Sequence, residues 1–146
     1  MLQAGKMEEI ADEVKKYNIQ ITALQEVRWP QDGWIKKKNY TLLYSQTKTS
    51  KEQHGTRLII PGCATQCILG FEPINERMCK LRIRGKFYNI TIMSECAPTE
   101  DENKRNNEDV ERYYNKLSDV CDKTRRNDAL ILLGDFNAKI GERTFK

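Results

Sequence analysis

The segment that most constrains the fold is "LILLGDFNAKIG", residues 130–141. Four aliphatic residues in a row, followed by Gly134, are typical of a short strand that is buried on both of its faces. Asp135 and Asn137 follow this run, so we expect them at the end of a central strand. Open α/β sheets place their chemistry at such strand ends. The segment therefore predicts an α/β fold with a candidate site at the edge of a sheet.

Helical and strand patterns alternate along the chain. Apolar residues follow helical spacing over residues 7–17, with glutamates early and lysines late, and a second amphipathic helix is expected over residues 103–126. Residues 28–39 are expected to form a loop, marked by Pro30 and Gly33. Strands are expected at residues 19–24, 40–44, 56–60, 65–71, 78–83, 88–93 and 129–133, with turns at "PG", "EPINE" and "RGK". This order predicts two sheets with helices outside them, in one domain over residues 1–146.

Composition narrows the class of protein. Charged residues make up 32% of the chain, and no apolar run approaches the roughly 20 residues that span a bilayer. The N-terminus lacks the apolar stretch of a signal peptide, so we expect an intracellular protein, cytoplasmic or nuclear. Five cysteines without a CxxC pair favour reduced thiols over a disulfide framework. A net charge of +4 is a modest indication of a polyanionic partner.

Two of the expected strands end in oxygen ligands. Glu26 follows the strand at residues 19–24, and Asp135 with Asn137 follows the last one. Mg²⁺ prefers carboxylate oxygens and keeps several waters, so one or two carboxylates hold it against a phosphate. Such an ion stabilises phosphoryl charge, while an Asp orients or deprotonates the attacking water and an Asn amide donates to a phosphate oxygen. These residue types therefore point to metal-assisted chemistry at a phosphate.

Three motifs in this order, "ALQEVRW", "CAPTE" and "GDFNAKIG", resemble the endonuclease/exonuclease/phosphatase superfamily. Within it, the resemblance is to the apurinic-endonuclease-like domain of RTE-class LINE retrotransposons, and is closer still to the domesticated copy in bucentaur-type craniofacial development proteins. The resemblance implies a four-layer α/β sandwich and Mg²⁺-dependent cleavage of DNA phosphodiester bonds. It also implies that Glu26 is a metal ligand, that Asp135 activates water and that Asn137 binds the phosphate.

The chain departs from the family pattern at several positions. Cys96 occupies the substrate-binding position of a family tyrosine that hydrogen-bonds the phosphate. An Asn before the first helix and a C-terminal Asp-His pair are also expected in the family, whereas the single histidine here, His54, lies far upstream. We therefore expect a partial sandwich that lacks the family's first and last strands. Two hypotheses follow: a degenerate domain that serves as a binding or interaction module, or an active Mg²⁺-dependent endonuclease or phosphodiesterase.

Several features also have simpler interpretations. Asp135 and Asn137 can form an Asx-type turn and nothing more. Arg57 is either an edge-strand residue or a new contact. Lysines at positions 36–38, 48 and 51 can form a phosphate-tracking surface or only a solvated face, of which the solvated face is favoured. Any nucleic-acid binding, through residues 36–38 or through Arg125 and Arg126, is expected to be non-specific and sensitive to salt.

Self-association is the last expectation from the sequence. If the family's outer strands are missing, the strands at residues 19–24 and 129–133 lack neighbours, and unpaired backbone groups on apolar strands are costly. A closed two-fold dimer is the commonest way to cover such edges.

Overall fold

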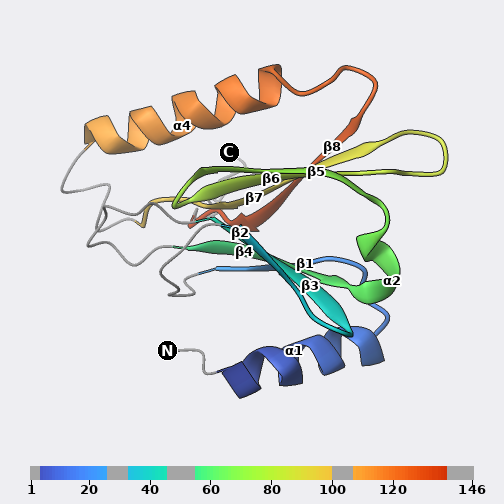
Figure 1. The fold of residues 1–146 in the computed structure, drawn as a ribbon. Helices are drawn as coiled ribbons and strands as arrows, with labels where there is room; N and C mark the ends of the chain where they lie inside the picture. The colour runs from blue at the N-terminus through green and yellow to red at the C-terminus, as the bar shows by residue number, and fades with distance from the viewer. Residues whose placement is uncertain (1–3, 26–32, 46–54, 100–106, 138–146) are drawn as a thin grey trace, which may run out of the picture.

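A computed structural model describes residues 4–25, 33–45, 55–99 and 107–137. Two four-stranded sheets lie one above the other, with helix α1 on the outer side of one sheet and helix α4 on the outer side of the other (Figure 1). The chain therefore has the predicted α/β architecture, with two sheets flanked by helices. Its elements are α1 (Ala4–Lys16), β1 (Thr22–Leu24), β2 (Gly33–Lys36), β3 (Tyr40–Ser45), β4 (Thr56–Pro61), α2 (Gly62–Thr65), β5 (Ile68–Asn75), β6 (Met78–Ile83), β7 (Ile90–Cys96), α4 (Asn107–Asp122) and β8 (Ala129–Asp135).

The first sheet has the strand order β1-β4-β3-β2, and its described strands pair antiparallel. Alternate residues of β3 and β4 face opposite sides, as strand geometry requires. On the outer side, the apolar stripe of α1, including Met7 and Ala11, packs on Leu42 and Ile59. On the inner side, residues such as Leu58 enter the core between the two sheets. Strands β3 and β4 are the two inner strands of the sheet, and both of their faces are buried.

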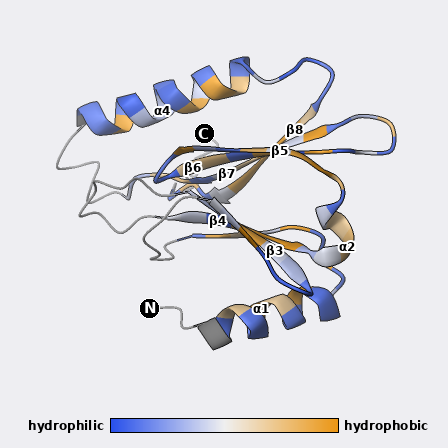
Figure 2. Cartoon of the chain, viewed as in Figure 1, coloured by the Kyte–Doolittle hydropathy of each residue, from blue (hydrophilic) through white to orange (hydrophobic). Residues whose placement is uncertain are grey.

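The second sheet has the order β5-β6-β7-β8. Its first three strands pair antiparallel, whereas β7 and β8 run parallel because α4 lies between them in the sequence and carries the chain back across the sheet. Leu81 and Ile92 point into the core between the sheets, and Tyr113 of α4 packs on Met78 on the outer side. Both long helices carry hydrophilic residues along much of their length, with hydrophobic residues between them (Figure 2). Each helix therefore covers its sheet with one apolar stripe.

Three expectations about the elements are wrong. Residues 28–39 were expected to form a loop, but Gly33–Lys36 forms β2 and pairs with β3. Pairing with β3 makes these residues a strand, because a segment of four residues is too short to show a clear hydrophobic alternation of its own. Where a strand was expected to begin at residue 65, Gly62–Thr65 is a short helix, and β5 runs from Ile68 to Asn75 through most of the expected "EPINE" turn.

The prediction that the "LILL" strand is central and buried on both faces is also wrong for the described chain. Strand β8 is the outer strand of its sheet among the described strands, and Leu130, Ile131 and Leu132 are 39%, 41% and 37% exposed. The described contacts of α4 are with β5, β6 and β7, so the helix leaves Leu130 and Leu132 uncovered, whereas Ile131 pairs with Ile92 and lies on the opposite face. Leu133 alone of this run packs against the core between the sheets.

Within the described residues, no helix is long and apolar enough to cross a membrane. The five cysteines are all free thiols in the structure.

Candidate functional site

The two C-terminal motifs meet because β7 and β8 are parallel. The register places Cys96 beside Asp135 at the carboxyl ends of the two strands. The backbone N–H of Ala97 donates to the carbonyl oxygen of Asp135 at 2.8 Å. The "CAPTE" and "GDFN" segments, about 40 residues apart in the chain, are thus joined directly by their backbones.

Gly134 makes this close pairing possible. A Cβ atom at this position would lie 1.8 Å from the carbonyl oxygen of Glu95, far inside van der Waals contact. Gly134 also has a φ of +159°. The glycine of the "GDFN" motif is therefore required by the approach of one strand to the next, whatever chemistry follows it.

Asn137 adopts a left-handed backbone conformation, with φ of +45°. Its backbone N–H donates to Oδ1 of Asp135 at 2.9 Å, which is the Asx-type turn considered above. Its side-chain Nδ2 donates to the carbonyl oxygen of Ala97 at 2.7 Å. Asp135 and Asn137 therefore fasten the ends of β7 and β8 together, while the carboxylate of Asp135 remains exposed.

The end of β1 reaches the same place from the other sheet. Gln25 and Asp135 line one open groove of about 410 Å³, together with Ile21 and Leu133. Nε2 of Gln25 donates to Oγ of Ser94 at 3.3 Å, a hydrogen bond between the two sheets. The ends of β1 and β8 therefore meet across the two sheets.

The proposed metal ligand, Glu26, directly follows Gln25 but lies outside the described residues, as does His54. In the described part of the chain, no group of three or more His, Cys, Asp or Glu side chains is arranged to hold a metal ion. Cys96, at the position of the family tyrosine, is buried, and its backbone N–H donates to the carbonyl oxygen of Arg77 at 2.9 Å. Of the four sequence-predicted site residues, the structure therefore brings Asp135, Asn137 and Cys96 together.

Glu95 is a buried acid that sequence reasoning missed. It is fully buried on the α4 side of β7, where its Oε2 accepts a hydrogen bond from the hydroxyl of Tyr113. In the described residues, its Oε1 has no hydrogen-bond partner. Burial, together with the nearby charge of Asp135, raises the pKa of Glu95 to about 7. The available signal was an acid inside the apolar run "ITIMSEC", with a tyrosine on the apolar stripe of the following helix.

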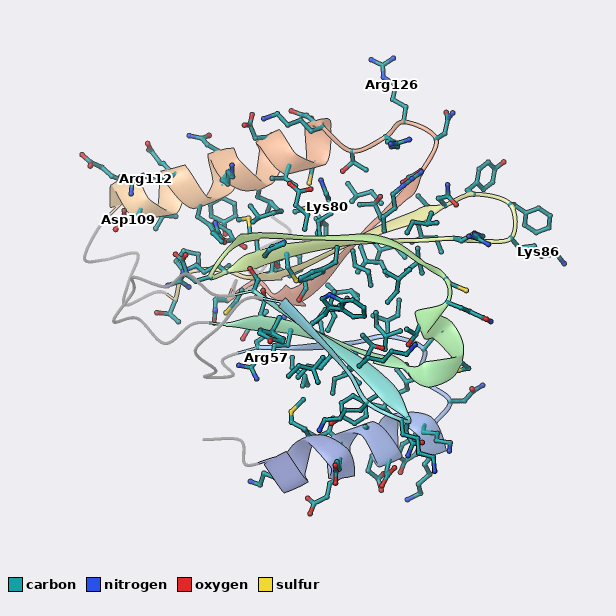
Figure 3. All side chains as sticks on the ribbon, viewed as in Figure 1. Arg57, Lys80, Lys86, Asp109, Arg112 and Arg126 are labelled. Carbon is teal, nitrogen blue, oxygen red and sulfur yellow. The ribbon has the colours of Figure 1, made fainter. Side chains whose placement is uncertain are left out.

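Arg57 is not an edge residue. It lies in β4, an inner strand, between Leu24 of β1 and Tyr44 of β3, and is buried. Burial lowers the pKa of its guanidinium to about 10, so Arg57 stays charged at neutral pH. Figure 3 shows Arg57 on the first sheet, at the end of the molecule where α4 begins.

A family model described as "Endonuclease/Exonuclease/phosphatase family" matches residues 3–146. The chain belongs to this family. It is 29% identical over 142 residues to craniofacial development protein 2 of Tragulus javanicus and 28% identical to that of Bos taurus. Each alignment covers 97% of this chain but only 24% and 23% of the relatives. The chain thus spans about a quarter of the length of these curated relatives.

Solved structures of low sequence identity share the family fold. TDP2 from C. elegans matches 91% of this chain and 42% of its own, with a TM-score of 0.58 and 14% identity. A family protein from Leptotrichia buccalis matches 93% of this chain and 62% of its own, with a TM-score of 0.59 and 16% identity. These matches agree with the predicted sandwich.

The buried acid gives a prediction about pH. The pKa of Glu95 rises from an ordinary value of 4.5 to about 7 in the folded chain, so its contribution to stability is complete below pH 4.5 and is lost as the pH rises through 7. This loss is on the order of 3 kcal/mol, at about 1.4 kcal/mol for each tenfold difference in proton affinity. Glu95→Gln keeps the size and the contact with Tyr113 but cannot ionise. Urea denaturation at pH 5 and pH 8 should show the wild type losing stability relative to the variant, and parallel pH profiles would contradict this.

Proposed function

We propose that the chain is an endonuclease/exonuclease/phosphatase domain that keeps the family fold, has absent or very weak phosphodiester cleavage, and serves as a binding or interaction module. One observation carries the proposal. The amide of Asn137 donates to the backbone of Ala97, and Asp135 accepts from the backbone of Asn137. Groups that the family directs at substrate are here engaged in holding strand ends.

The position of the family tyrosine supports the same proposal. Cys96 is buried and has no phenol hydroxyl to donate to a phosphate. Losing one transition-state donor commonly costs about 10²- to 10³-fold in rate, and losing a general acid or base about 10²- to 10⁴-fold. Because the tyrosine hydroxyl is absent and the Asn137 amide is engaged by Ala97, two such losses combine and would leave cleavage close to background.

A Mg²⁺ site remains part of the proposal in a weakened form. Glu26 and Asp135 would be its protein ligands, and a bound ion would neutralise phosphate charge there. The described residues contribute the exposed carboxylate of Asp135 to such a site and do not by themselves complete it. Too few ligands predict weak affinity, because hard cations need several oxygens in fixed positions.

The proposed partners follow from charge. A net charge of +4 favours weak, sequence-independent contact with DNA or another polyanion inside the cell, nuclear or cytoplasmic. Descent from a LINE endonuclease domain would account for a nucleic-acid preference without strong catalysis.

The active Mg²⁺-dependent endonuclease stays the alternative function. The exposure of Asp135 in a groove shared with β1 favours this alternative.

A plasmid-nicking assay separates these two functions. With Mg²⁺ and supercoiled plasmid, the chain should nick no faster than its Asp135→Ala variant, because Cys96 is buried without a phenol hydroxyl and the Asn137 amide is engaged by Ala97. Equal folding of the two proteins is checked by circular dichroism. Robust nicking that disappears in Asp135→Ala would establish the active alternative instead.

We also propose that the chain self-associates through the flank formed by β1 and β8. These are the outer strands of their sheets among the described strands, and they share the apolar groove near Ile19 and Ile21. Leu133 of β8 lines that groove, and the preceding residues Leu130, Ile131 and Leu132 are exposed. Pairing with a second copy about a two-fold axis would cover both the backbone edge and the apolar side chains.

Light scattering coupled to size exclusion tests this proposal over the micromolar range. The chain should elute as a dimer, and Ile131→Lys should shift it to a monomer, because a charge on an edge strand opposes pairing. Trp34→Lys is the matched control, since Trp34 is exposed on β2, the strand at the opposite edge of the first sheet. A well-folded wild-type monomer throughout the range would refute self-association.

A further inference from the structure

A second groove lies at the end of the second sheet opposite the candidate site. It has a volume of about 530 Å³ and is formed by the turn between β6 and β7 and by the loop between α4 and β8. Strands β7 and β8 begin at this end and run toward Cys96 and Asp135 at the other (Figure 1). The groove is therefore separate from the motifs that relate the chain to its family.

Two aromatic rings beside this groove are among the most exposed apolar groups of the described chain. Phe87 is 82% exposed and Tyr88 is 71% exposed. Nζ of Lys86 lies 5.4 Å from the centroid of the Phe87 ring, within cation–π range. Adjacent exposed rings beside cations are the arrangement on which nucleic-acid bases stack.

The turn that presents the rings is tightly built. A Cβ atom on Gly85 would lie 2.0 Å from the carbonyl oxygen of Tyr88, so the turn closes only around a glycine. The backbone N–H of Ala129 donates to the carbonyl oxygen of Asn89 at 2.9 Å, which fastens the turn to the start of β8. The aromatic turn and the basic loop are therefore held in one arrangement.

The groove carries a net positive charge. Among its described lining residues are Arg82, Arg125 and Arg126, and one acid, Asp128. Nε and Nη2 of Arg82 donate to the two carboxylate oxygens of Asp128 at 2.5 and 2.9 Å, and Oγ1 of Thr91 donates to the same carboxylate at 2.8 Å.

The hydrogen bonds from Arg82 hold the pKa of Asp128 at about 2, so this acid stays ionised and offsets Arg82. Three arginines against one acid leave the described lining with a net positive charge, even though the charge of Arg125 also acts on Asp128. Figure 3 shows Arg126 and Lys86 at this same end of the molecule.

We propose that this groove binds single-stranded nucleic acid, with phosphates at Arg125 and Arg126 and unpaired bases stacked on Phe87 and Tyr88. A duplex offers the phosphates but keeps its base faces stacked, so it lacks the second half of the interaction. The inference deepens the proposed binding role and rests on it, because it names the part of a polyanionic partner that the chain recognises.

Fluorescence anisotropy with labelled oligo-dT and oligo-U tests the groove on the whole chain, with a duplex of equal length for comparison. The double variant Phe87→Ala/Tyr88→Ala should weaken single-strand binding by roughly tenfold or more, because it removes both rings on which bases stack. Duplex binding should change little. Phe87→Trp/Tyr88→Trp keeps the stacking surface and should restore the affinity, which separates stacking from misfolding. The two oligonucleotides show whether DNA, RNA or both are bound.

Charge is tested separately. Arg125→Ala/Arg126→Ala should weaken single-strand binding and flatten its dependence on salt, because fewer counterions are released. Lys15→Ala/Lys16→Ala removes the same amount of charge from α1. This control should have little effect on the affinity for single strands or on its dependence on salt. Single-strand binding that is indifferent to both groove variants overturns the inference while leaving polyanion binding intact. Absence of binding to every nucleic acid overturns the inference together with the proposed contact with DNA.

Discussion

The parallel pairing of β7 with β8 is the constraint on which the rest of the structure depends. It requires a crossover, which α4 supplies, and it brings Cys96 and Asp135 side by side at one edge of the sheet. Gly134 permits the close approach, and the side chain of Asn137 closes the two strand ends. The same pairing places the start of β8 beside the β6–β7 turn, at the opposite ends of these strands. One pairing thus builds both the family-related site and the basic aromatic groove.

Much of this arrangement could be predicted from the sequence. The helix over residues 7–17, most of the strands and the two-sheet architecture follow from apolar periodicity, and the ordered motifs pointed to the family. The positions of Gln25 and Asp135 at strand ends also follow from the sequence, whereas their meeting in one groove depends on how the two sheets pack on each other.

The sequence alone could not give features that depend on which elements become neighbours. An aliphatic run such as "LILL" looks the same in a central strand and in an outer one, so the exposure of Ile131 was missed. The burial of Glu95 depends on α4, which places Tyr113 over it. The burial of Arg57 depends on the position of β4 as an inner strand of its sheet. The groove near Phe87 depends on a loop about 40 residues away, which no local pattern connects to it.

The central claim is that motif residues of the family now hold strand ends together, and the stability of Asn137 variants tests it most directly. Asn137→Ala and Asn137→Gly both remove the hydrogen bond to Ala97, and the glycine tolerates the positive φ. Equilibrium denaturation should show both less stable than the wild type by about 1 kcal/mol or more, with Asn127→Ala, an exposed loop asparagine, as the control. Variants as stable as the wild type, or more stable, would show that the hydrogen bonds of Asn137 do not hold the strand ends together and would contradict the account.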